Sequence, residues 1–147
     1  MSRLDIQSDS GHNLTRFVEA QETTFETALS EIRAGRKQSH WMWFIFPQIA
    51  GLGFSAMSQK YAISSLAEAK AYLEHPILGA RLRELMQTAL DVNGRTANQI
   101  FGSPDDMKLR SSATLFAHVS PKGSVFEQVL DKYFAGKPDD ATMKLLH

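Results

Sequence analysis

"RKQSHWMWFIFPQIAGLG", residues Arg36–Gly53, decides the fold, because it sets both tryptophans of the chain in one run of aromatic residues. Residues Trp41–Phe46 are apolar on every side of a helix, a pattern typical of an element that the rest of the protein surrounds. Ser39 can cap the start of such a helix, and Pro47 fits its end. We therefore predict a short central helix around which the core is built.

A buried strand is the alternative for this run, because short apolar segments fit either structure. The other β-leaning run, "TLFAHV" at residues 114–119, continues a helical pattern that begins after Pro104. A strand without a partner would leave its backbone hydrogen-bonding groups unsatisfied. The sequence therefore predicts an all-α fold, a single compact domain of about six to eight helices around the Trp/Phe-rich short helix.

Apolar residues at three- and four-residue steps predict the surrounding helices. The first runs from a cap at Asn13 to Gly35, which suits the left-handed position that ends a helix. Ser65 and Glu68 form a capping box at the start of another. The remaining helices are predicted over residues 76–92, 96–101, 104–118 and 125–135, and from residue 139 onward.

Length and composition indicate one globular domain. A chain of 147 residues buries roughly two thirds of its unfolded surface on folding, which is enough for one core. We predict a flexible tail over residues 1–12 and a single α-helical domain over residues 13–147. The 16 basic and 16 acidic residues cancel, so no overall field attracts a polyanion and no nucleic-acid partner is expected.

The residues that the chain lacks exclude several kinds of chemistry. There is no cysteine, which removes disulfides, thiolate nucleophiles and cysteine-ligated metals. The five histidines are far apart in the sequence, so no metal site is predicted. The N-terminal stretch "MSRLDIQSDSGHN" has no apolar run of the kind a signal peptide needs, and no apolar stretch reaches the ~18 residues of a membrane span. We therefore expect a cytoplasmic protein that does not enter a membrane.

Cationic and amide side chains flank the aromatic run, and this combination suits a small anionic ligand. Aromatic faces beside cationic donors are a recurring way to hold a base and its phosphate. Further polar residues follow one another at helical spacing in the stretch after Pro104. We predict a site for a small anionic or nucleotide-like ligand from these residues: Arg36, Lys37, His40, Trp41, Trp43, Gln48, Lys108, Ser111 and His118.

Other interpretations stay open. Arg36 and Lys37 also suit the C-terminal end of the preceding helix, where positive charge is favourable without any ligand. Exposed helix faces would instead make the protein an interaction module without catalytic activity. A hydrolase or transferase that uses His40 or His118 with Asp106 is a third hypothesis, although no complete catalytic motif is present. The sequence assigns no catalytic residue, cofactor or oligomeric state.

Three segments resemble a known family. They are "FVEAQETTFETALSEIRAGRKQSHWMWFIFPQIAGLGFSAMSQKYAI", "AYLEHPILGARL" and "IFGSPDDMKLRSSATLFAHV". Together they are similar to DUF1810, a family of bacterial proteins of unknown function that is sometimes labelled calpastatin. The resemblance extends from about residue 14 to residue 146 and implies a single, mainly α-helical domain. It brings no activity, cofactor or catalytic residue.

Overall fold

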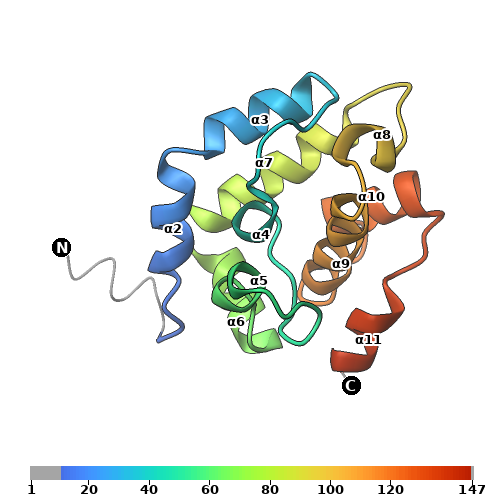
Figure 1. The fold of residues 1–147 in the computed structure, drawn as a ribbon. Helices are drawn as coiled ribbons and strands as arrows, with labels where there is room; N and C mark the ends of the chain where they lie inside the picture. Colours follow the sequence, from blue (N-terminus) through green and yellow to red (C-terminus); the bar gives the residue numbers. More distant parts are fainter. Residues whose placement is uncertain (1–10, 147) are drawn as a thin grey trace.

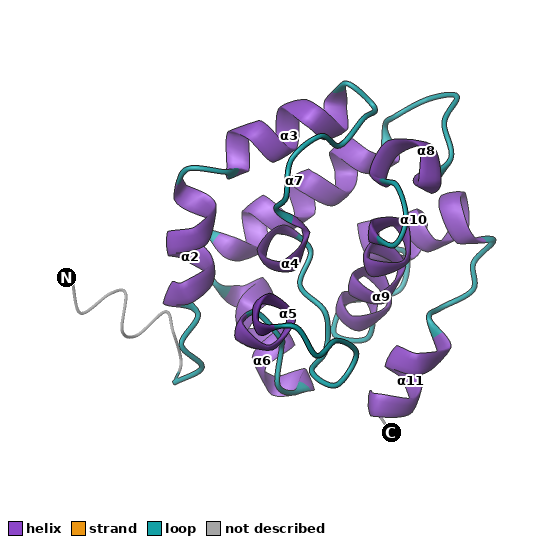
Figure 2. Cartoon of the chain, viewed as in Figure 1, coloured by secondary structure: helices purple, strands orange, loops and turns teal. Residues whose placement is uncertain are grey.

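The structure is a computed structural model that describes residues 11–146. That range contains ten helices and no strand (Figures 1 and 2), and an isolated parallel bridge joins Ile49 to Ile63. The helices are α2 (Thr15–Glu22), α3 (Phe25–Arg33), α4 (Met42–Ile45), α5 (Ala56–Lys60), α6 (Leu66–Glu74), α7 (Leu78–Leu90), α8 (Ala97–Phe101), α9 (Asp105–Ala117), α10 (Val125–Phe134) and α11 (Asp140–Leu146). The predicted all-α fold is confirmed, with more helices than expected.

The aromatic run forms the short helix α4, and the others surround it (Figure 1). Trp41, Ile45 and Phe46 have no exposed surface, and the rings of Trp41 and Phe46 both lie against Phe101. Their burial removes a large apolar area from water, which is the main favourable contribution to folding. The predicted central helix is confirmed, although Trp43 is only partly buried.

Ser39 does not cap α4, contrary to the prediction. The residue that precedes α4 is Trp41, which makes no side-chain capping hydrogen bond. The Ser39 hydroxyl instead donates to a carboxylate oxygen of Glu31, at 2.5 Å. A carboxylate is a stronger acceptor than the alternative partners of a hydroxyl, so Ser39 is drawn to α3.

The first predicted helix is divided into two, which is one source of the extra helices. The chain turns at Thr23 and Thr24, where the Thr24 amide donates to Gln21 O at 3.1 Å. The turn lets α2 pack on α4 while α3 packs on α7. Asn13 does not cap α2, because it has a left-handed backbone with a φ of 50° and Leu14 precedes the helix. Gly35 has a φ of 79°, which confirms the predicted helix end.

Side-chain caps confirm most of the other predicted helix starts. Thr96 forms a complete capping box with Gln99 at the start of α8. The Ser124 hydroxyl accepts from an amide in the first turn of α10, and Ser65 does the same at α6. The predicted capping box at α6 is incomplete, because the Glu68 carboxylate accepts from the Ser64 amide and not from the Ser65 amide. Such caps satisfy amides that have no partner inside the helix. The Asp139 carboxylate accepts from the Thr142 amide at 2.9 Å and begins α11.

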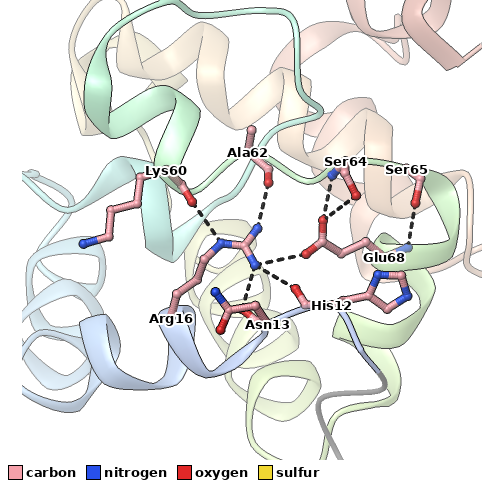
Figure 3. A network of polar contacts seen from close by, with 8 residues as sticks. All are labelled: His12, Asn13, Arg16, Lys60, Ala62, Ser64, Ser65 and Glu68. Carbon is pink, nitrogen blue, oxygen red and sulfur yellow. Dashed lines mark hydrogen bonds and ion pairs between the residues drawn. The ribbon is translucent and has the colours of Figure 1, made fainter.

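A buried ion pair between Arg16 and Glu68 joins α2 to α6 (Figure 3). The two side chains are 3.1 Å apart and have 16% and 3% of their surface exposed. The guanidinium also donates to the carbonyl oxygens of Lys60 at 2.9 Å and Ala62 at 2.8 Å, and Glu68 accepts from the Ser64 amide at 2.7 Å. These hydrogen bonds compensate for the removal of both charges from water. The cluster therefore fixes α2, α6 and the segment before α6 together.

Ser112 carries a buried hydroxyl without a hydrogen-bond partner within residues 11–146. Because such a group loses its bonds to water on folding, we expect Ser112→Ala to raise the free energy of unfolding by about 1 kcal/mol. Thr114→Val is the control on the same helix, since the Thr114 hydroxyl accepts from the Asp139 amide at 2.9 Å and its loss should destabilise the protein. Urea unfolding measures both variants. A marked loss of stability in Ser112→Ala would contradict this prediction.

Two further predictions concern membrane-spanning segments and the N-terminal tail. In the part that the structure describes, no helix is both long and apolar enough to cross a bilayer. The predicted flexible tail, residues 1–12, lies almost entirely outside the described residues.

Candidate functional site

Two of the predicted cationic residues share one carboxylate. Lys37 Nζ lies 2.8 Å from one carboxylate oxygen of Asp105, and Lys108 Nζ lies 3.4 Å from the other. The Lys37 side chain is 8% exposed and lies over the Trp41 ring, at 4.9 Å from its centroid. The Lys108 side chain is 23% exposed and lies over the Trp43 ring, at 5.3 Å. Lys37 is thus engaged inside the protein, whereas Lys108 still reaches solvent.

The buried Trp41 is held by Glu31 in α3. The indole Nε1 donates to Glu31 Oε1 at 2.9 Å, and the same oxygen accepts from the Gln38 amide at 2.8 Å and the Ser39 amide at 3.0 Å. Partial burial raises the pKa of Glu31, but the donors that surround the carboxylate outweigh it and lower the pKa below its ordinary value of 4.5. This arrangement secures the segment before α4 and leaves no face of Trp41 for a ligand.

The lowered pKa of Glu31 makes part of the stability depend on pH. A carboxyl group with a lower pKa in the folded state contributes stability that is present above the unfolded pKa and is lost as the pH falls through the folded pKa. We expect Glu31→Gln to be less stable than the parent at pH 7, and the difference to shrink below a pH of 4.5. Denaturant unfolding at pH 7, 5 and 3 measures this. A difference that stays constant with pH would contradict it.

Three of the predicted site residues meet at one cleft between the α4–α5 loop (residues 46–55), α9 and α11. Gln48 comes from the loop, and Lys108 and Ser111 come from successive turns of α9. The cleft has a volume of about 240 Å³. We call it the Lys108 cleft, and it is lined by Gln48, Leu52, Gly53, Ser58, Pro104, Met107, Lys108, Ser111, Asp139 and Ala141.

A narrower cavity lies against the same loop. It shares Gln48, Leu52, Gly53 and Ser58 with the Lys108 cleft, and Trp43 forms part of its wall. The loop, which is the segment after α4 in Figure 1, therefore lines both hollows. Trp43 therefore contributes to both hollows. Its ring contacts Lys108, the cation of the Lys108 cleft, and it also forms part of the wall of the narrower cavity.

The remaining predicted site residues lie elsewhere. Arg36 and His40 are exposed and line neither hollow at the loop. His118 lines a different cavity of about 280 Å³ between α9, α10 and α11, together with Glu127 and Asp131. The Asp106 carboxylate accepts from the Met107 amide at 2.9 Å, as expected of an acidic residue in the first turn of a helix. The structure brings together neither His40 nor His118 with Asp106 at either of these cavities.

Several cleft residues were missed by sequence reasoning. No sequence pattern assigned a role to Leu52, Gly53 or Ser58, and all three line the cleft. Asp139 was identified as a helix start, and its approach to α9 depends on packing of the chain end. The available sequence signal for these residues was "GLGF", in which a single residue separates two glycines. Closely spaced glycines often mark a loop whose backbone approaches a neighbouring segment.

The cleft offers hydrogen-bond donors and one solvent-reaching cation. Lys108 supplies a positive charge, Asp139 a negative one, and Gln48, Ser58 and Ser111 supply polar groups. Among residues 11–146, no group of His, Cys, Asp or Glu side chains is arranged to hold a metal ion. The geometry is suited to holding a polar ligand by hydrogen bonds and charge.

Fold and cleft together define a small all-α domain whose helices surround an aromatic centre. The chain belongs to a family described as "Protein of unknown function (DUF1810)", whose sequence profile matches residues 11–146. It is similar to a crystal structure of the conserved hypothetical protein Rv1873 from Mycobacterium tuberculosis, with 49% sequence identity and a TM-score of 0.89. That likeness covers 91% of this chain and 96% of the other. No protein with a curated description matches the chain.

Proposed function

We propose that the protein binds a small anionic ligand in the Lys108 cleft. The observation that carries this proposal is the meeting of Gln48, from the α4–α5 loop, with Lys108 and Ser111, from the distant helix α9, at one hollow of about 240 Å³. Ligand sites are typically concave and lined by a few convergent polar groups. The predicted ligand donors Arg36, Lys37, His40 and Trp41 have no part in this revised site.

One cation and one carboxylate line the cleft, Lys108 and Asp139. Asp139 already accepts from the Thr142 amide at 2.9 Å and hydroxyl at 2.7 Å, which leaves Lys108 as the charged group that can meet an anion. Lys37 and Lys108 share the single carboxylate of Asp105, so these three side chains together carry one excess positive charge. Lys37 is the closer partner and the more buried one. Lys108, at 3.4 Å from Asp105 and partly exposed, can therefore turn toward a phosphate or carboxylate group at little cost.

The size of the cleft limits the ligand. Sites for drug-sized molecules usually enclose about 300–1,000 Å³. A cleft of about 240 Å³ suits a phosphorylated metabolite or a nucleoside monophosphate better than a dinucleotide. This agrees with the nucleotide-like ligand that the aromatic and basic residues predict.

Titration of the parent protein with nucleotides and phosphorylated metabolites tests the proposal. Tryptophan fluorescence is the readout, because Trp43 lies beneath Lys108. We expect a saturable change with at least one member of the panel. Lys108→Ala should weaken that affinity by about ten- to a hundredfold, since a hydrogen bond to a charged group contributes roughly 1.5–3 kcal/mol.

Lys122→Ala is the matched control, because this exposed lysine lies between α9 and α10 and does not line the cleft. Both variants should melt close to the parent, since partly exposed ion pairs contribute little stability. Equal loss of affinity in the two variants would point to general electrostatic attraction. The absence of saturable binding to any member of the panel would refute the proposal.

An interaction module is the second candidate function, and one observation favours it. Four large apolar side chains within residues 11–146 are exposed. Of these, Met107 lines the Lys108 cleft, Phe54 follows the lining residue Gly53, and Leu145 lies near Gly51 of the same loop. Exposed apolar groups that gather in one place mark contact sites. This function becomes the better interpretation if no small ligand binds.

A further inference from the structure

We propose that the cavity between α9, α10 and α11 binds a small aliphatic diamine. The cavity has a volume of about 280 Å³. It is a second site and does not rest on the proposed function, since it shares no lining residue with the Lys108 cleft. The charge of its lining residues, its apolar wall and the spacing of two carboxylates together indicate this class of ligand.

The charge at the cavity is negative. Glu127 and Asp131 line it from successive turns of α10, and His118 is the other titratable side chain in its wall. Ala117, the last residue of α9, also lines the cavity, so the negative end of that helix lies there as well. Among the described residues that line the cavity, none is a lysine or an arginine. The cavity therefore attracts a cation and repels the anions that suit the Lys108 cleft.

The two carboxylates can still accept hydrogen bonds from a ligand. Glu127 Oε1 accepts from the Gly123 amide at 2.8 Å, and the second oxygen of this carboxylate has no partner within residues 11–146. In the same range, the Asp131 carboxylate has no hydrogen-bond or ion-pair partner. A Cβ atom on Gly136 would lie 3.1 Å from Asp131 Oδ1, so the carboxylate lies against this glycine, which also lines the cavity.

An apolar wall favours an organic cation over a metal ion. Leu130 of α10, Pro138 of the following loop and Met143 of α11 form this wall. Methylene groups of an aliphatic chain are stabilised against such a surface, and a methionine side chain adapts its shape to them. A hydrated metal ion gains nothing from apolar contacts.

The spacing of the carboxylates selects two positive charges. Side chains four residues apart on one helix face have Cβ atoms about 5–6 Å apart, and like charges in this relation repel each other. Glu127 and Asp131 have this spacing on α10. A ligand with an ammonium group at each end of a short chain can pair with both carboxylates and remove their repulsion, whereas a monoamine pairs with one.

Three probes of similar length test the proposal: 1,4-diaminobutane, butylamine and 1,4-butanediol. Two-dimensional NMR titration of the parent should give saturable shifts of the amides around the cavity with the diamine. The diamine should bind about fivefold more tightly than butylamine, because it forms a second partly exposed ion pair. The diol, which has no charge, should give no saturable shift.

Asp131→Asn should weaken binding of the diamine about fivefold, to the affinity of butylamine. Its thermal melting should match that of the parent, because Asp131 is exposed. Glu26→Gln is the matched control, since Glu26 is an exposed acidic residue of α3 that does not line the cavity. Lys108→Ala should also bind the diamine as the parent does, so this site can be tested independently of the anion site.

Several results would overturn the inference. Equal affinity of the parent for the diamine and for butylamine would show that the two carboxylates do not act together. An equal loss of affinity in Glu26→Gln and Asp131→Asn would indicate general attraction of cations to the surface. The absence of saturable shifts around the cavity with the diamine would exclude the site, and the anion site at Lys108 would be unaffected by that result.

Discussion

Replacement of Arg16 by alanine is expected to lower the free energy of unfolding by about 3–5 kcal/mol, as is usual when one partner of a buried ion pair is removed. The variant leaves the Glu68 carboxylate, of which 3% is exposed, without its cationic partner. It also removes the donors to the carbonyl oxygens of Lys60 and Ala62. In addition, the guanidinium covers the Phe17 ring at 4.4 Å, so its loss exposes part of the core.

Urea unfolding at pH 7 measures this effect. Arg36→Ala is the matched control, because Arg36 is exposed and the same change there should alter stability by less than about 0.5 kcal/mol. Arg16→Lys should recover only part of the loss, since a lysine cannot reproduce the several directions in which the guanidinium donates. A cost for Arg16→Ala as small as that of Arg36→Ala would show that the cluster does not hold α2 in place.

The second large effect is expected from Trp41→Ala, which should destabilise the protein by about 3–5 kcal/mol because a fully buried indole leaves a cavity. The same change removes the indole donor to Glu31. Trp41→Phe separates the two contributions, since it keeps most of the packing and loses only the hydrogen bond. Chemical denaturation followed by far-ultraviolet circular dichroism is the measurement, because the fluorescence signal changes with the mutation itself.

Trp43→Ala is the control for this second prediction. Its side chain is only partly buried, so the cost should be clearly smaller than at Trp41. The aromatic run by itself does not distinguish the two tryptophans, because both belong to the stretch Trp41–Phe46 that is apolar on every side of a helix. If Trp43→Ala proves as costly as Trp41→Ala, the assignment of Trp41 as the centre of the core is wrong.

Much of the fold followed from local patterns. The central aromatic helix, the glycine end at Gly35 and the capped start at Thr96 each depend on residues within a turn or two of one another. Where a prediction was wrong, the cause was a contact with residues farther away in the sequence. The division at Thr23 depends on packing of α2 and α3 against different helices, and the displacement of Ser39 from α4 depends on Glu31.

The candidate site could be predicted less well than the fold from local sequence patterns. Residue types suggested that Lys37 and Lys108 were similar donors, and both had the charge that an anion needs. In the structure Asp105 lies between them, and Lys37 is buried against Trp41 whereas Lys108 lies at the cleft. Burial separates the two lysines, and burial depends on which elements pack together.

By itself, the sequence determined the class of fold, the centre of the core and most helix ends, because hydrophobic spacing and capping act between residues a few positions apart. Only the tertiary structure decided which predicted donors meet. Gln48 meets Lys108 and Ser111 at one cleft because α9 packs against the loop, and no local pattern records that contact. The physical reason is that the spacing of apolar residues shows which face of a helix is buried. It does not show which other element covers that face, because this depends on how all the helices pack into one core.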